Sequence, residues 1–379
     1  MIDFIRLEKI ETEWEDIQKE CNFYEYNTPI NREEERRKTL KLYKSGVSYN
    51  PKFIYRKPPN YPIKKILTFM NKLKPKDFYI EKFYYEKAQN FMLDIYSIIT
   101  HEPRIISAAT CLSYGLPNND LLNKAFKILP KSFIDYSNDI KNFTNKDISE
   151  PIKNILSQVG FNDWDVVITA PMNAPMFVQE FDKKIYIRKD IYISLQTLKR
   201  AIIHELGVHV LRYENGIKQS IRLFRSGFPM YLETEEGLAV YCEEKYKVLG
   251  NETLQEYAGR YIAANLALTQ PFSEVFKFIS TKLGPKKAFD IVTRSKRGFI
   301  NTEQPGAHTK DIIYFGGYLS MKKYLDKNSN DYKLFFIGQI GIQQIPIIKT
   351  MLNDGIISMP NLLPDDFNKL INTYLEDKK

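Results

Sequence analysis

Residues 201–210 read Ala-Ile-Ile-His-Glu-Leu-Gly-Val-His-Val, so that two histidines stand five positions apart with a glutamate directly after the first. Apolar side chains recur at helical spacing through this region, at Leu195, Leu198, Ile202 and Leu206. Ser194 is a residue type that caps the start of a helix, and Asn215-Gly216 is a typical stop. The segment is therefore predicted to be a helix that is buried along one side and carries both histidines near its C-terminal end.

The spacing of the two histidines requires a departure from a regular α-helix. A five-residue step turns a side chain by about 500°, which leaves His209 roughly 140° away from His204. A single wider turn of the π type restacks the two residues, and such turns are concentrated at functional sites. Gly207 lies between them and is expected to permit the distortion. We therefore expect a π-type turn that lets both imidazoles reach one ion.

A pair of glutamates follows at the start of a second predicted helix, in Thr234-Glu235-Glu236. Two imidazoles, a carboxylate from another helix and Glu205 as a base are the groups that a catalytic zinc site needs, so the combination favours a metallohydrolase. The alternative is that these are ordinary solvated polar residues, with Thr234 as a helix cap and the acids interacting only with the helix dipole. The chain has only four histidines, and two of them fall here, which favours the metal site.

The two motifs resemble the microtubule-associated tyrosine carboxypeptidases and their bacterial relatives of unknown function, which are marked by a Gln-Glu-Gly-Leu-Ala motif. The matching residues are His-Glu-x-Gly-x-His at 204–209, Arg212, Asn215-Gly216, and Thr-Glu-Glu-Gly-Leu-Ala at 234–239. A distal block is similar to the same family: Arg294, Lys296, Arg297, Gly298, Thr302, Gln304-Pro305-Gly306, Lys310-Asp311 and Tyr314. Asn31, Glu33 to Glu35 and Asn50-Pro51 resemble its first segment, so the resemblance spans most of the chain.

The resemblance implies a zinc ion bound by His204, His209 and a carboxylate, with Glu205 as the general base. The bacterial motif has Gln where Glu235 stands, which makes Glu236 the expected third ligand. Neighbours on a helix diverge by about 100°, so only one of the two glutamates can serve. Glu235 is then expected to orient a ligand or the helix end.

The distal block is the expected contact for the substrate. Removal of a C-terminal residue requires a fixed cation for the free carboxylate, and the local candidates are Arg294, Lys296, Arg297 and Lys310. By spacing alone a solvated basic loop is an equal alternative; the resemblance favours binding by Arg294, Arg297 and Lys310. Tyr314 and His308 are both possible donors to a developing oxyanion, and the motif match covers only Tyr314. His101 is interpreted as structural.

Composition limits the class of protein. The chain has 379 residues, of which 43% are hydrophobic and 27% charged, as in a folded globular protein. Three scattered cysteines, Cys21, Cys111 and Cys242, exclude a disulfide framework or a thiolate metal site and favour a reducing compartment. No stretch is apolar and long enough to cross a bilayer, and no basic-then-apolar signal or nucleic-acid motif is present. We expect a cytoplasmic protein, although signal-independent secretion would leave no such trace. Its net charge of +9 favours an acidic partner.

The expected fold class is α+β with a helical majority. Residues 1–155 read as mostly helical, with a proline-rich connector at 58–62 and a turn at 116–119. Residues 164–169 and 176–188 read as strands, with a hairpin turn at Asp182-Lys183-Lys184. Residues 156–325 are predicted to form a zincin-like metallopeptidase core, with a small sheet and the metal-binding helix, and 326–379 a helical region packed on it, with breaks at Asp354-Gly355 and Pro360.

Together these patterns predict a zinc-dependent metallocarboxypeptidase that removes a C-terminal residue, which the resemblance indicates to be tyrosine, from an exposed acidic protein tail. Tubulin is the substrate that the animal relatives imply, and the bacterial relatives leave that substrate open. Two alternatives remain: a metal-containing binding protein for an acidic partner that does not cleave it, and a zinc endopeptidase or amidase with no pocket for a terminal carboxylate. The intact Glu205 argues against the binding protein, because a non-catalytic zinc site needs no base.

Overall fold

The computed structural model describes residues 3–21, 23, 25–76, 79–133, 143–169 and 175–375. The chain forms two compact units, each built from two separate segments. The first unit comprises Met1–Asp135 with Glu252–Gly316, and the second Tyr136–Asn251 with Gly317–Lys379. The sequence predicts three consecutive regions instead, and that division stays a prediction.

The described part of the first unit is made of helices. They are α1 (Phe4–Lys19), α2 (Arg32–Lys44), α3 (Ile63–Lys72), α4 (Tyr79–Ile99), α5 (Pro103–Tyr114), α6 (Asn119–Ile128), α12 (Asn251–Ala267), α13 (Phe272–Leu283), α14 (Pro285–Ser295) and the short 3-10 helix η2 (Thr309–Asp311). Helix α4 packs along α5, and α13 along α14. Large aromatic and aliphatic side chains fill the interior, among them Trp14, Tyr84 and Phe272. The predicted connector at 58–62 is confirmed, since it lies between α2 and α3. The predicted turn at 116–119 falls where α5 ends and α6 begins, with Asn119 as the first residue of α6.

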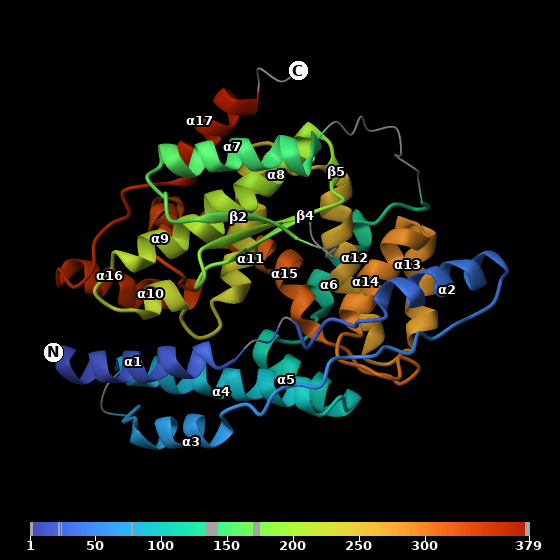
Figure 1. Cartoon of the computed structure of the whole chain (residues 1–379), viewed down its shortest axis with the longest axis horizontal. Helices are drawn as coiled ribbons and strands as arrows, with labels where there is room; N and C mark the ends of the chain where they lie inside the picture. Colours follow the sequence, from blue (N-terminus) through green and yellow to red (C-terminus); the bar gives the residue numbers. More distant parts are fainter. Residues whose placement is uncertain are drawn as a thin grey trace. The chain divides into compact units, whose positions relative to one another are not determined.

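The second unit contains the sheets, drawn in green in Figure 1. Its strands are β1 (Phe143–Thr144), β2 (Asp165–Thr169), β3 (Met176–Gln179), β4 (Lys184–Arg188) and β5 (Tyr192–Ile193). Three of them form a sheet in the order β2-β4-β3, with β2 parallel to β4 and β3 antiparallel to it, and β1 pairs with β5. Val178 lies opposite Ile185, so the predicted hairpin is confirmed. Its turn lies at 180–183, since Lys184 already belongs to β4.

The second unit also contains helices. They are α7 (Asn145–Gln158), α8 (Leu195–His204), the π-helix η1 (Glu205–Val210), α9 (Leu211–Ile217), α10 (Leu223–Ser226), α11 (Leu232–Lys245), η3 (Ser329–Phe336), η4 (Ile342–Gln344), α16 (Ile345–Asn353) and α17 (Pro364–Leu375). Helix α7 packs on β2 and β4, while η1 contacts β3 and α11. Helix α15 (Ile312–Leu325) contains the boundary between the units.

The α+β, helix-rich fold class is confirmed, and the breaks at Asp354-Gly355 and Pro360 separate α16 from α17 as predicted. The zincin-like core stays a prediction. The alternative interpretation of Thr234 as a helix cap is wrong, because α11 begins two residues earlier, at Leu232, with Tyr231 as its N-cap. No helix in the described ranges is both long and apolar enough to cross a membrane.

Candidate metal centre

The two histidines lie on consecutive turns of one continuous helical segment. Ser194 caps α8 by accepting a hydrogen bond from the backbone N–H of Thr197, and α8 runs to His204. The next six residues, which include His209, form a π-helix, so the predicted π-type turn is confirmed. Gly207 is not what permits it, since an added Cβ there would meet nothing nearer than Phe367 at 3.8 Å and no positive φ is needed. The π turn restacks the two imidazoles, whose ring centroids are 4.9 Å apart.

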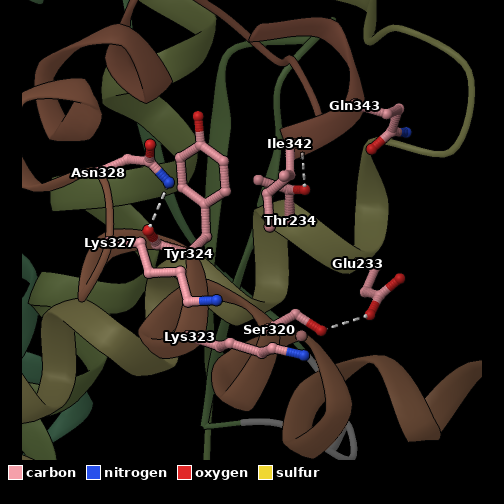
Figure 2. Close-up of a pocket in the computed structure, with 10 residues that line it drawn as sticks. Glu233, Thr234, Ser320, Lys323, Tyr324, Lys327, Asn328, Ile342 and Gln343 are labelled. Carbon is pink, nitrogen blue, oxygen red and sulfur yellow. Dashed lines mark hydrogen bonds between the residues drawn. The ribbon is translucent and has the colours of Figure 1, made fainter.

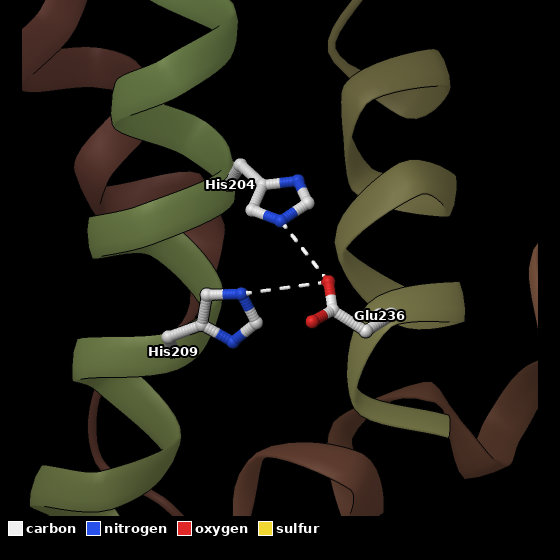
Figure 3. Close-up of side chains that lie close together, drawn as sticks. All are labelled: His204, His209 and Glu236. Carbon is white, nitrogen blue, oxygen red and sulfur yellow. Dashed lines mark ion pairs between the residues drawn. The ribbon is translucent and has the colours of Figure 1, made fainter. Parts of the chain in front are cut away.

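Glu236 extends from α11 toward both imidazoles, as Figure 3 shows. Its Oε2 lies 3.3 Å from Nε2 of His204 and 3.9 Å from Nε2 of His209. One ligand atom from each of the three residues lies within 4.8 Å of the others. Four-coordinate zinc with bonds of about 2.0–2.1 Å separates its ligand atoms by roughly 3.3 Å, so small adjustments would fit an ion here.

A second carboxylate hydrogen-bonds each imidazole at Nδ1, the ring nitrogen that faces away from Glu236. Nδ1 of His204 lies 2.8 Å from Oε1 of Glu243, and Nδ1 of His209 lies 2.8 Å from Oε1 of Glu235. A carboxylate can only accept, so each Nδ1 carries the hydrogen and each Nε2 is directed to the centre. Both outer carboxylates are buried, with Glu243 0% and Glu235 2% exposed. This carboxylate-histidine arrangement is the usual support for a metal-binding imidazole.

The carboxylates also change the protonation of the two rings. Burial lowers the pKa of His204, but its hydrogen bonds with Glu236 and Glu243 outweigh this and raise the pKa to about 10. Burial acts on His209 in the same way, and the hydrogen bond with Glu235 raises its pKa to about 9. A metal ion that binds near neutral pH must therefore displace a proton from the rings.

The outer carboxylates are themselves paired with arginines. Nη1 of Arg200, one turn before His204 on α8, lies 3.1 Å from Oε1 of Glu243. Arg212 is fully buried and donates to Oε2 of Glu235. Its remaining nitrogens donate to the carbonyl oxygens of Phe335, Gly338 and Ile340 at 2.6–3.0 Å. The guanidinium of Arg212 thus ties residues 335–340 to the glutamate that holds His209.

Two further carboxylates lie near the three candidate ligands. Burial raises the pKa of Glu205, while the positive charges of His204 and His209 oppose the rise. A base with a raised pKa is better matched to proton transfer near neutral pH. Glu180, directly after strand β3, accepts a hydrogen bond from Nε2 of Gln339 at 3.1 Å, and burial raises its pKa to about 7. The sequence analysis did not single out Glu180, Glu243 or Arg200; the only available signal was spacing, since Glu243 stands seven residues after Glu236.

The four residues predicted to bind substrate lie in the first unit, where Arg294 and Tyr314 belong to one cluster. Nε and Nη2 of Arg294 both donate to buried Asp311, and the guanidinium lies 5.9 Å from the ring centre of Tyr314. Tyr314 stacks on Tyr257 with ring centroids 5.5 Å apart. The cation of Lys310 lies 5.9 Å from the ring centre of Tyr114. Their roles, and that of Arg297, stay predictions.

The remaining polar residues in and around the distal block make contacts within the fold. Lys296 is fully buried, and its Nζ lies 2.8–3.2 Å from the carbonyl oxygens of Ala267, Gln270, Gln304 and Gly306. His308 is buried and stacked on Tyr114. His101 stacks on Tyr55 and hydrogen-bonds through Nδ1 to the carbonyl of Gly298, which agrees with its structural interpretation.

Comparisons with known proteins cover most of this chain. The family model for microtubule-associated tyrosine carboxypeptidase matches residues 41–375. The human protein MATCAP2, named provisionally as a tyrosine carboxypeptidase, is 26% identical over 175 residues, which are 44% of this chain and 33% of that protein. Mouse microtubule-associated tyrosine carboxypeptidase 1 is 26% identical over 156 residues, 39% of this chain and 32% of that protein. The match thus spans about a third of the length of these curated relatives. Because the family model covers residues 41–375, with the histidine and glutamate motifs inside that range, the chain belongs to the microtubule-associated tyrosine carboxypeptidase family.

Proposed function

We propose that this chain is a zinc metallocarboxypeptidase that removes the C-terminal residue from an exposed acidic protein tail. The observation that carries the proposal is the convergence of His204, His209 and Glu236 beside Glu205. Two imidazoles and one carboxylate form a donor set that zinc takes in hydrolases, with the fourth position left for water or substrate. The names of the family relatives support carboxypeptidase chemistry.

The donor set fits a metal ion better than it fits a purely structural cluster. Both Nε2 atoms face Glu236, and both Nδ1 hydrogens are accepted by buried carboxylates. Four carboxylates, Glu205, Glu235, Glu236 and Glu243, surround the two imidazoles, and two arginines pair with the outer ones. When both rings are neutral, as metal binding requires, two negative charges remain, which a divalent cation would neutralise.

In the proposed hydrolysis, the bound ion and the protein side chains supply different parts of the catalysis. A bound zinc ion supplies Lewis acidity and lowers the pKa of a coordinated water to about 7. Glu205 accepts the proton of the attacking water as the oxygen bonds to the terminal amide carbon. As the C–N bond breaks, Glu205 passes that proton to the leaving amine, so that no net proton is gained or lost. Glu243 and Glu235 keep the two imidazoles oriented throughout.

A protein substrate is proposed from the names of the relatives, and an acidic tail from the charge of this chain. The net charge of +9 favours association with an acidic segment. Tyrosine as the released residue, and a tubulin-like tail, follow the relatives' names and belong to the same proposal, as does a cytoplasmic location.

The test is a library of peptides that share one sequence and end in different residues, each made with a free and with an amidated C-terminus. Mass spectrometry should show loss of a single terminal residue from the free-acid peptides, and no product with the Glu205→Gln variant. Equal cleavage of amidated peptides, or internal cuts, would indicate an endopeptidase or amidase instead. Tight binding of acidic peptides without any product from the zinc-loaded chain would favour the non-catalytic binding protein.

A further inference from the structure

A pocket of about 380 Å³ lies in the second unit, between the first turn of α11 and the C-terminal half of α15. Its volume falls within the range of small-molecule and side-chain binding sites, about 300–1,000 Å³. The lining residues are Glu233, Thr234, Gly317, Ser320, Lys323, Tyr324, Lys327, Asn328, Ile342 and Gln343. Figure 2 shows Lys323, Tyr324, Lys327 and Asn328 approaching it from one side and Glu233 and Thr234 from the other.

The charge of the pocket is positive. Lys323 and Lys327 are both exposed, and within the part of the chain that the structure describes neither makes an ion pair. The one carboxylate of the lining, Glu233, accepts a hydrogen bond from the hydroxyl of Ser320 at 3.2 Å. The nearby Asp331 is neutralised by Lys349 at 2.8 Å. The two lysines therefore exceed the negative charge around them.

The polar groups of the walls are held in place. The hydroxyl of Tyr324 donates to Asp331 at 2.6 Å, which fixes the ring as one wall. The amide of Asn328 donates to the carbonyl of Tyr324, and Thr234 accepts from the backbone N–H of Ile342. Cations near the C-terminal end of α15 also interact favourably with the helix dipole. That interaction does not explain why both lysines line one fixed pocket.

The position of the pocket links it to the metal centre. Glu233 and Thr234 come directly before Glu235 and Glu236 on α11. The Cα atoms of Glu233 and Glu236 are separated by a rise of about 4.5 Å along the helix axis. With the reach of the side chains, the pocket lies roughly 10–15 Å from the candidate metal ligands, the length of three to four extended residues.

We propose that this pocket binds an acidic side chain of the substrate tail, about three to four residues before the cleaved end. The proposal rests on the carboxypeptidase function proposed above and names the chemistry of its upstream substrate. Lys323 and Lys327 would pair with the carboxylate, and the aliphatic parts of both lysines and the ring of Tyr324 would contact its methylene groups.

The test uses peptides with a common C-terminal pair of residues and either glutamate or glutamine at the upstream positions. The zinc-loaded Glu205→Gln chain provides a binding readout by fluorescence anisotropy, so that binding is measured without turnover. With Lys323→Gln and Lys327→Gln combined, the affinity for the glutamate peptide should fall about 5- to 20-fold, since each exposed pair contributes modestly. The glutamine peptide should bind both forms equally. Lys333→Gln, an exposed lysine of the same unit outside the pocket, is the matched control.

The outcomes of this experiment distinguish failure of the proposed pocket from failure of the proposed carboxypeptidase function. If the double variant lost affinity equally for the glutamate and the glutamine peptide, or if Lys333→Gln lost as much affinity, the lysines would act only through general charge. Either result would overturn the proposal that the pocket binds an acidic side chain. Unchanged affinity in the double variant would overturn it as well. If the active chain cleaves the glutamate peptide but shows the same KM with and without the two lysines, the carboxypeptidase proposal stands and the pocket fails. If glutamate-selective binding is lost in the double variant while no peptide is ever cleaved, the pocket is a binding site and the function fails.

Discussion

The strongest single test of the metal centre is to neutralise Glu243 without removing it. This carboxylate is fully buried and touches no expected substrate atom; it accepts from Nδ1 of His204 at 2.8 Å and lies 3.1 Å from Nη1 of Arg200. Glu243→Gln keeps the size of the side chain and leaves an oxygen that can still accept from His204. What it removes is the negative charge that raises the basicity of the imidazole.

The expected loss is a 10- to 100-fold weaker zinc affinity, the usual effect of removing such a supporting partner. This corresponds to about 1.4–2.7 kcal/mol. Affinity is measured by competition with a chromogenic chelator, and circular dichroism establishes that the variant remains folded, since Arg200 also loses a partner. The expected zinc content of the unaltered chain is one ion.

The neighbouring residue supplies the control. Glu244 lies on the same helix, and its carboxylate pairs with Lys322 at 2.8 Å with both side chains more than a third exposed. Glu244→Gln should leave zinc affinity unchanged. If the zinc affinities of Glu243→Gln and Glu244→Gln both equal that of the unaltered chain, the carboxylate of Glu243 does not support a metal ligand. The arrangement around His204 would then be only structural.

Three further outcomes are expected. His204→Ala and His209→Ala should each lose most of the bound zinc, because each removes one of three ligands; elemental analysis checks this, and full metal content in both would exclude the site. Glu205→Gln should keep its zinc and its fold while activity falls by roughly two to four orders of magnitude, the usual contribution of a general base, as steady-state kinetics will show; normal turnover would reduce Glu205 to a helix residue. Burial lowers the pKa of Lys296 from 10.5 to about 7, so the unfolded chain binds more protons between those values and stability rises with pH through that window. Chemical unfolding between pH 7.5 and 9.5 should show a shallower rise in stability for Lys296→Met, and identical slopes would mean that burial does not lower the pKa of this lysine.

The π turn that brings His204 and His209 together could be predicted from sequence because it depends on neighbours in the chain. The spacing of His204 and His209 is incompatible with a regular helix, and the π turn is the smallest change that restores one face. The hairpin of β3 and β4 was predictable for the same reason, since its strands are adjacent. The start of α11 was missed because Thr234 is a typical cap residue, whereas in the structure its hydroxyl accepts from Ile342, more than 100 residues away.

The partners that hold the site could not be predicted, because they depend on packing between distant segments. Arg212 is part of the motif, yet three of its four acceptors are the residues Phe335, Gly338 and Ile340. The pairing of Arg294 with Asp311 depends on how η2 folds back toward α14. A substrate carboxylate would have to compete with Asp311 for that guanidinium, so binding by Arg294 needs more than a basic residue in the right motif.

The register of α11 joins the metal centre to the pocket. Three of its carboxylates, Glu235, Glu236 and Glu243, face two imidazoles that the π turn has fixed, so a shift of α11 by one turn would break all of these contacts together. Helix α15 restricts that shift, because a Cβ added at Gly237 would lie 2.2 Å from the backbone of Gly317. The same contact brings the first turn of α11 against the face of α15 that carries Ser320 and Lys323. A ligand in the pocket would therefore contact the helix that carries Glu236, the third candidate metal ligand, where close backbone packing leaves that helix little room to move.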